Sequence, residues 1–395
     1  MWSFSAIHPH SKRRLSLFTL ELTQQCNFRC SYCCFSGKYH DRRVHNARQM
    51  TLETMEQTLR FIVDSHCKDR LTIVTFYGGE ALLALDKIKW MISHLRLALG
   101  SNVGFSISTN GYALSKDVVD WLCTVDDCEV YITIDGYREL HDSNRRTAGG
   151  QPTFDRIMSN LRYFRDKYPV EYNKRVHFLV TLQRWRQLPE VSDKWMNNSF
   201  LRDKIPVHMS FILPKNIQEM RNSVSPMKER LEVLELALER YQKGEDSLLT
   251  RQFKEWTDGP LRNMSHWQNG TEITVATCLE DMYRTFISAE GDVYVCERFC
   301  SNFTIGHVSY KQVLDERKID ELEQHFIDRR NRLCTHCTAA KSCTMCMTSL
   351  NYSDEELSAL CVTEREMCAA IKEYSWRRRM YDRKKELSNI NNFVK

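Results

Sequence analysis

The sequence lacks any apolar stretch long enough to cross a membrane. A spanning helix needs about 20 consecutive, mostly apolar residues, and the 395-residue chain contains no such run. Its first residues, MWSFSAIHPHSKRRLSLF, have no continuous hydrophobic core and no small-residue cleavage site, so they do not resemble a secretory signal peptide. We therefore expect a cytoplasmic protein without a membrane partner.

The sequence also has no internal repeat, no low-complexity segment and little excess charge of either sign. A formal net charge of +5 is too small to indicate a nucleic-acid partner by itself. Apolar residues make up 42% and charged residues 27% of the chain, an ordinary balance for a globular protein. The length allows one large domain or two moderate ones.

Cysteine, in contrast, is abundant, with 16 residues in the chain. Thiols stay reduced in the cytoplasm, so this number favours metal ligation over disulfide bonds. Four cysteines stand in the nine residues CNFRCSYCC (26–34), and most of the others lie between residues 278 and 368. Cys67, Cys123 and Cys128 are expected to pack in the core.

The first half of the chain alternates β-branched apolar runs with amphipathic helical patterns. Strands are predicted at 15–22, 71–77, 103–108, 129–135, 175–182 and 206–213. Helices are predicted at 50–66, 86–99, 116–125, 153–167 and, more weakly, 188–200. This order implies parallel strands with right-handed crossovers, either in a doubly wound sheet or in a partial (β/α) barrel. In both folds ligands bind at the carboxyl ends of the strands, where the first cysteine cluster begins.

After residue 213 the alternation ends. A long helix is predicted at 225–244, with Ser225 as its N-cap and Gly244 at its end. The predicted segments are an N-terminal extension (1–14), the α/β region (15–215), a helical connector (216–270), a cysteine-rich region (271–370) and a basic helical tail (371–395).

Cys26, Cys30 and Cys33 have the spacing C-x3-C-x2-C. Three thiolates on one loop can bind three irons of a [4Fe–4S] cluster and leave the fourth iron open to a small molecule. A structural cluster or zinc site needs four ligands. We therefore interpret the loop as a reactive iron–sulfur site, and a zinc loop with a distant fourth ligand is the alternative. Cys34 is expected to point away and pack.

This spacing, with the aromatic Tyr32 before the third cysteine, resembles that of the radical S-adenosylmethionine enzymes. The motifs FYGGE (76–80), STNG (108–111), ITIDG (132–136) and HDSNR (141–145) follow in the same order as that family's motifs. Glycines permit close backbone approach, and an arginine suits a carboxylate. Ala81 replaces a proline that many relatives have. The resemblance implies S-adenosylmethionine as cofactor, bound by Tyr32, Gly78, Gly79, Glu80, Asn110, Thr133, Arg145 and Leu213.

The later cysteines resemble the SPASM extension of these enzymes, which carries two auxiliary [4Fe–4S] clusters. The resemblance rests on a C-x12-G-x4-C pattern and on CTHCTAAKSCTMC, whose last gap is one residue shorter than in the family. It implies one cluster on Cys278, Cys296 and Cys346, with Cys300 or substrate as the fourth ligand. It implies another on Cys334, Cys337, Cys343 and Cys361, with Cys361 preferred to Cys368. Two zinc ribbons over 334–361 are the alternative.

The fold implied is a partial (β/α)6 TIM-like barrel followed by a small iron–sulfur domain, with three [4Fe–4S] clusters in total. An electron from a small donor such as flavodoxin or ferredoxin would cleave S-adenosylmethionine, and the 5′-deoxyadenosyl radical would take hydrogen from a substrate. The resemblance favours peptide maturases, which install thioether or carbon–carbon crosslinks or related oxidations in ribosomally made precursor peptides. Anaerobic sulfatase maturation, which forms formylglycine, is one alternative. A non-catalytic electron-transfer protein is the other.

Two positions separate the first two functions. Sulfatase maturases usually have glutamine before GGE and aspartate after the second cysteine of the C-x12-G-x4-C pattern, whereas this chain has Tyr77 and Glu297. We predict that Glu297 is a catalytic base, and a surface glutamate paired with Arg298 or Arg284 is the alternative.

Only 25 residues precede Cys26, too few for a leader-recognition domain. Leader binding would then need a separate protein, the barrel surface or the tail YSWRRRMYDRKK (374–385), whose plainer interpretation is a solvated helix face.

Overall fold

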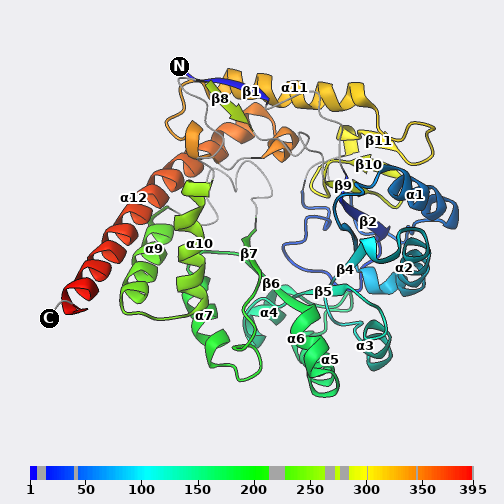
Figure 1. Cartoon of the computed structure of the whole chain (residues 1–395), viewed down its shortest axis with the longest axis horizontal. Coiled ribbons are helices and arrows are strands. Elements are labelled where there is room, and N and C mark those ends of the chain that lie inside the picture. Colours follow the sequence, from blue (N-terminus) through cyan, green and yellow to red (C-terminus); the bar gives the residue numbers. More distant parts are fainter. Residues whose placement is uncertain are drawn as a thin grey trace.

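A computed structural model describes residues 1–6, 15–39, 43–212, 227–262, 272–275, 284–299, 301–343 and 346–393. Six strands form the centre of the fold (Figure 1). They are β2 (Leu17–Thr23), β3 (Thr72–Gly78), β4 (Val103–Thr109), β5 (Cys128–Thr133), β6 (Val176–Leu182) and β7 (His208–Phe211). All pair in parallel with their neighbours and in chain order. A doubly wound sheet would reverse its strand order, so the predicted partial barrel is confirmed.

Helices follow the strands and cover the outside of the sheet (Figure 1). They are α1 (Leu52–Ser65), α2 (Leu85–Leu99), α3 (Lys116–Leu122), α4 (Arg138–Asn144), α5 (Phe154–Lys167), α6 (Pro169–Arg175) and α7 (Gln187–Asn197). The start of α1 is set by its N-cap residue, Thr51, whose side chain accepts a hydrogen bond from the backbone N–H of Thr54. Met55 and Ile62, one face of the same helix, are buried against the sheet.

Side chains alternate along the strands between the helix layer and the barrel interior. Phe18 of β2 is fully buried and meets Phe61 of α1 edge to face. The opposite face carries small polar side chains, such as Thr75 and Ser106, whose hydroxyls lie 2.7 Å apart. The interior is therefore polar and uncrowded at its mouth, which leaves room for a ligand.

The cysteine-rich region continues the barrel sheet, which the sequence did not predict. Its strands are β9 (Arg284–Ile287), β10 (Asp292–Tyr294) and β11 (Gly306–His307). β9 pairs in parallel with β2, and β10 and β11 add antiparallel strands to give a nine-stranded sheet. This pairing places the turn between β9 and β10 at the carboxyl end of β2, where the Ala289 backbone donates to Glu21.

Two helices, α9 (Met227–Gln242) and α10 (Leu248–Arg262), form the described part of the connector, where the sequence predicted one. The last helix, α12 (Asp354–Phe393), packs on both. It runs without a break across residue 370, where a separate tail was expected to begin. Ser375 Oγ donates to the Thr257 carbonyl (2.7 Å), and Arg377 pairs with Glu235, so part of this tail is docked on the connector.

The N-terminal segment joins the C-terminal region (Figure 1). β1 (Ser3–Ala6) pairs in parallel with β8 (Glu272–Val275) and contacts α11 (Glu316–Leu333). The Phe4 amide donates to Asn331 Oδ1 at 2.8 Å, and Asn331 Nδ2 donates back to the Phe4 carbonyl at 3.1 Å. None of the helices in the described ranges is long and apolar enough to span a membrane.

Candidate active site

A cavity of about 620 Å³ lies at the carboxyl ends of the parallel strands. Its lining brings together sequence-predicted residues from six segments of the chain: Cys26, Cys30, Tyr32, Cys33, Gly78, Gly79, Glu80, Asn110, Thr133, Arg145 and Glu297. Three other predicted site residues, Leu213, Cys278 and Cys300, lie outside the described residues.

The first cysteine loop presents its three spaced thiols to this cavity. Cys26, Cys30 and Cys33 are half-buried, and the backbone of Cys33 donates to the Cys30 carbonyl at 3.2 Å. Burial raises the pKa of the Cys26 thiol to about 12, and the other two thiols add to the shift. A hydrogen bond with Cys34, followed by burial, raises the pKa of Cys33 to about 12. Thiolates in such a place need a cationic group beside them, and an iron–sulfur cluster supplies one.

Cys34 does not pack as expected. Its side chain is exposed, lines the cavity and hydrogen-bonds with Cys33. The tight turn that follows Cys33, in which Ser36 N donates to the Cys33 carbonyl at 3.0 Å, turns the side chain outward. Cys67 and Cys128 are buried as predicted, and Cys123 is half-buried.

A buried polar network holds the loop from behind. The Tyr32 hydroxyl donates to Asp135 and accepts from Arg145 Nη1 at 2.8 Å. Asp135 is fully buried, and its other oxygen accepts from the backbone N–H of Thr181 at 3.0 Å. Burial raises the pKa of the Asp135 carboxyl, which Arg145, Tyr32 and Thr181 partly oppose. Arg145 is 6% exposed, and its Nε has no hydrogen-bond partner among the described residues.

The GGE motif packs directly beneath the cysteine loop. Gly79 N donates to the Thr23 carbonyl at 2.8 Å, and Glu80 N donates to the Gln25 carbonyl at 2.9 Å. A Cβ on Gly79 would lie 2.2 Å from the Gln25 carbonyl oxygen, so no larger residue fits there. The glycines thus bring β3 against the chain just before Cys26.

The Glu80 carboxylate is buried and satisfied by protein donors. It accepts from the Asn110 backbone (2.7 Å), the Thr109 hydroxyl (2.5 Å) and the Leu82 backbone (3.1 Å). Burial raises its pKa, which these hydrogen bonds oppose. Asn110 then donates through Nδ2 to Asn27 Oδ1 at 2.7 Å, which links the end of β4 to the cysteine loop.

Glu297 lines the same cavity. Its side chain is 23% exposed. The carboxylate lies 3.9 Å from both Arg284 and Arg298, so Glu297 also has the ion pairs expected of a surface residue. Burial, then the charges of Cys34 and Glu297, raise the pKa of Tyr77. Cys296 beside it is half-buried, and Cys346 is exposed with Sγ 2.8 Å from Thr348 Oγ1.

A second cavity gathers the remaining thiols. It is lined by Cys334, Cys337, Cys343, Cys361 and Cys368 together with residues of α11 and α12. Burial and then the charges of Cys334, Cys343 and Cys337 raise the pKa of Cys361 to about 11. The pKa of Cys368 also rises to about 11 through burial, but Cys343 is the only thiol that contributes to it. Cys368 Sγ donates instead to the Ser342 carbonyl at 3.6 Å. Both cysteines line the cavity, so the choice of Cys361 over Cys368 as a ligand stays a prediction.

The arrangement of the described thiols is compatible with iron–sulfur clusters. The 14 described cysteines form no disulfide bonds with one another. Within the same residues no group of three His, Cys, Asp or Glu side chains could hold a single metal ion. In a [4Fe–4S] cluster each thiolate binds a different iron, so its ligands need not meet at one point.

Several residues of the site were missed at the sequence level. Asp135, which is buried and bonds to Tyr32, stands inside the quoted ITIDG motif, so its position at a strand end was a usable signal. His45, Met209, Phe211 and Trp256 line the cavity, and no local pattern distinguishes them.

The chain is similar to known radical enzymes. The family model described as Radical SAM superfamily matches residues 20–188. A cysteine-type anaerobic sulfatase-maturating enzyme of Clostridium novyi (strain NT) is 27% identical over 164 residues, 41% of this chain but only 43% of that enzyme. One of Clostridium perfringens (strain 13 / Type A) is 22% identical over 381 residues, 89% of this chain and 95% of that enzyme. A GTP 3',8-cyclase of Haemophilus influenzae (strain ATCC 51907 / DSM 11121 / KW20 / Rd) is 26% identical over 299 residues, 72% and 78% of the two chains.

The likeness of fold extends through the cysteine-rich region. The structure of native anSMEcpe with bound AdoMet matches with a TM-score of 0.65 at 18% identity and covers 96% of this chain and 100% of that one. The order of parallel strands, the cysteine loop at their carboxyl ends and the family match agree with one another. Residues 20–188 of this chain therefore match a radical SAM domain.

Proposed function

We propose that the chain is a radical SAM enzyme that abstracts hydrogen from a ribosomally made precursor peptide and so installs a thioether or carbon–carbon crosslink, or a related oxidation. One observation carries this proposal. The residues expected to bind the cofactor line the same cavity as Glu297 and Arg298, which belong to the cysteine-rich region. A peptide side chain in that cavity would contact both.

Cys26, Cys30 and Cys33 would hold a [4Fe–4S] cluster, which with S-adenosylmethionine supplies one-electron cleavage chemistry when bound. Arg145 has unused N–H groups in the cavity and would pair with the cofactor's carboxylate. Glu80 and Asn110 would fix the strand ends on which the cofactor lies, with Tyr32, Gly78, Gly79, Thr133 and Leu213 completing the contacts.

Two auxiliary [4Fe–4S] clusters belong to the same proposal. One would use Cys334, Cys337, Cys343 and Cys361, and the other Cys278, Cys296 and Cys346 with Cys300 or substrate. A small electron donor such as flavodoxin or ferredoxin would reduce the enzyme, and a separate leader-recognition protein could present the peptide.

The cavity offers two kinds of wall to a peptide. One is apolar: Phe211 and Trp256 line the cavity, and each stacks with Trp185, with ring centroids 4.9 and 4.3 Å from it. The other is polar, with Glu297, Arg298 and Glu356. A peptide substrate has both surfaces. Native anSMEcpe, a similar fold, has been solved with a bound Kp18Cys peptide (TM-score 0.66, 18% identity), which supports this class.

Glu297 would act as the general base for the substrate. Oxidation of a substrate thiol or amide requires a proton to leave, and a carboxylate on the cavity wall can accept it. Arg284 and Arg298, each 3.9 Å from the Glu297 carboxylate, would hold it in place on the cavity wall.

Sulfatase maturation is the second candidate, because the similarity to the Clostridium perfringens enzyme spans 89% of this chain. Mass spectrometry separates the two. The reconstituted protein is incubated anaerobically with S-adenosylmethionine, reductant and either a sulfatase-derived cysteine peptide or candidate precursor peptides. A peptide that loses two hydrogens and gains an internal crosslink supports the proposal. Loss of two hydrogens together with replacement of the cysteine sulfur by oxygen supports formylglycine formation.

The Glu297→Gln variant tests the base in the same assay. We expect it to form 5′-deoxyadenosine at the wild-type rate but to yield far less modified peptide. Glu139→Gln, on an exposed position of α4, is the matched control and should behave like wild type. A normal peptide yield from Glu297→Gln would exclude Glu297 as the base. If the wild-type protein formed no 5′-deoxyadenosine, the remaining alternative would be a non-catalytic electron-transfer protein.

A further inference from the structure

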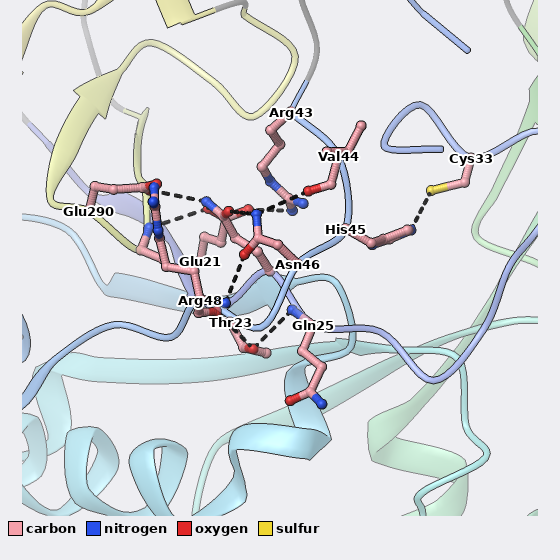
Figure 2. Close-up of polar contacts among 12 residues, drawn as sticks. Glu21, Thr23, Gln25, Cys33, Arg43, Val44, His45, Asn46, Arg48 and Glu290 are labelled. Atoms are coloured by element: carbon pink, nitrogen blue, oxygen red, sulfur yellow. Dashed lines mark hydrogen bonds and ion pairs between the residues drawn. The ribbon is translucent and has the colours of Figure 1, made fainter. Parts of the chain in front are cut away.

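The chain that follows the first cysteine loop is fixed at both ends, as Figure 2 shows. This anchored segment comprises residues 43–48. Arg43 forms an ion pair with Glu21 of β2, which is 1% exposed, and Arg48 forms one with Glu290 in the turn between β9 and β10. Asn46 Nδ2 donates to Gln24 Oε1 at 2.7 Å in the middle of the segment.

The anchors are joined to each other. Gln24 Nε2 lies 2.9 Å from Glu21 Oε2 and 3.0 Å from Glu290 Oε2, and the backbone N–H of Gln24 donates to the Arg48 carbonyl at 2.9 Å. The backbone of Ala289 also donates to Glu21 Oε2, at 3.2 Å. The anchored segment is thus held by the barrel and by the cysteine-rich region together.

His45 lies between the anchors, and its ring is directed at the cysteine loop (Figure 2). Its Nε2 is 3.4 Å from Cys33 Sγ, and the imidazole lines the active-site cavity. The ring packs against Phe35 edge to face, and Arg43 covers that phenyl ring at 3.7 Å. The backbone N–H of His45 donates to the Phe35 carbonyl at 3.1 Å, so both backbone and ring are held.

We infer that His45 is a positioning residue that donates an Nε2–H hydrogen bond to the Cys33 thiolate and raises the reduction potential of the cluster bound there. The inference rests on the proposed cluster at Cys26, Cys30 and Cys33. A thiolate that binds iron can only accept a hydrogen bond, so the donor must be the ring nitrogen that faces it. Hydrogen bonds to cluster sulfurs offset the negative charge added on reduction and thereby favour the reduced state.

The same geometry gives the anchored segment a purpose. If His45 lay on a loose loop, water would replace its imidazole as the hydrogen-bond partner of Cys33, because Cys33 is only half-buried. Arg43 and Arg48, paired on either side, hold His45 within reach of the sulfur. Glu290 belongs to the cysteine-rich region, so that region contributes to the environment of the first cluster without reaching it.

The test is a potentiometric titration of the reconstituted full-length protein, followed by electron paramagnetic resonance. The signal that changes on addition of S-adenosylmethionine belongs to the cluster with an open iron, which separates it from auxiliary clusters. His45→Phe keeps a planar ring and removes the donor, and His45→Gln places an amide N–H near the same point. His325→Phe, at an exposed position of α11, is the control.

We expect His45→Phe to show about fivefold less reduced cluster at a fixed poised potential, the effect of losing one ordinary hydrogen bond. His45→Gln should recover most of that loss, and His325→Phe should match wild type. An unchanged potential in His45→Phe with full iron content overturns the role of His45 alone. Equal loss in the Phe and Gln variants also overturns it, because the ring would then act only through packing. A wild-type protein without any signal that responds to S-adenosylmethionine overturns the proposed function itself.

Discussion

The hydroxyl of Tyr32 donates a hydrogen bond to the buried carboxylate of Asp135. The two residues come from different motifs, the cysteine loop and the end of β5, and Arg145 closes the network by donating to the same hydroxyl. A buried carboxylate and a buried guanidinium are thus linked through one phenol. The conformation of the cysteine loop depends on this link.

Tyr32→Phe should lower the free energy of unfolding by about 1–3 kcal/mol, because Asp135 and Arg145 each lose a buried partner. The anaerobic thermal midpoint and the iron content of the reconstituted protein measure this effect. Tyr131→Phe is the control, since that phenol bonds to the exposed Glu129, and it should cost no more than about 0.5 kcal/mol. Equal midpoints for the two variants would contradict a structural role for the network.

Arg145→Ala should weaken S-adenosylmethionine binding about tenfold or more, because a carboxylate would lose its charged partner. Isothermal calorimetry on the reconstituted protein measures the affinity. Arg146→Ala is a matched neighbour, since its exposed guanidinium donates only to the Gly150 carbonyl among its described contacts, at 3.0 Å. If Arg145→Ala binds the cofactor as tightly as Arg146→Ala does, Arg145 holds Tyr32 and not the ligand.

The strands of the barrel could be predicted from the sequence because their alternating apolar pattern is local. Predicted and observed bounds of β3 and β4 agree within one residue. β9, β10 and β11 have only four, three and two residues, which is too short to show an alternating apolar pattern. Their place in the sheet follows from pairing with β2, which lies far away in the chain.

The candidate site divides in the same way. Motifs at successive strand ends could be assembled in advance, since parallel strands bring their carboxyl ends to one edge. Cys34 and His45 could not be placed, because their directions depend on tight turns and on anchors such as Glu290 that are remote in sequence. The roles predicted for Leu213, Cys278 and Cys300 stay predictions.

Gly79→Ala should prevent normal seating of the cysteine loop. The new Cβ would lie 2.2 Å from the Gln25 carbonyl oxygen, a backbone atom that cannot rotate away, at a cost of about 3 kcal/mol or more. Soluble yield, thermal midpoint and iron content should all fall. Gly259→Ala in α10 meets nothing within 4 Å and should instead stabilise by up to about 1 kcal/mol. A Gly79→Ala protein with normal iron content would show that the loop can shift.

Stability should fall below pH 6.5 because of His141. This residue is fully buried; it accepts from the backbone N–H of Asp135 at 3.2 Å and lies 3.2 Å from Thr153 Oγ1. Burial, and then Arg145, lower its pKa well below the ordinary value. The unfolded chain therefore binds a proton near pH 6.5 that the folded chain does not, so folding weakens by about 1.4 kcal/mol per pH unit as the pH falls.

Thermal midpoints between pH 7.5 and 5.5 should show this slope, and His141→Gln, which cannot take up the proton, should flatten it. The difference between the two proteins isolates His141, because His177, whose pKa is also lowered, is present in both. Identical slopes would assign the acid sensitivity to other groups.

Cys361→Ala should remove about four irons of about twelve, whereas Cys368→Ala should leave the iron content unchanged. The four thiols of Cys334, Cys337, Cys343 and Cys361 line one cavity. Cys368 lines it too, but its thiol donates to the Ser342 carbonyl. Iron and sulfide analysis of both variants after anaerobic reconstitution measures the difference. The converse pattern would make Cys368 the ligand, since it lies about two turns from Cys361 on nearly the same face of α12 and lines the same cavity. Full iron in both variants would mean that either thiol can complete the cluster.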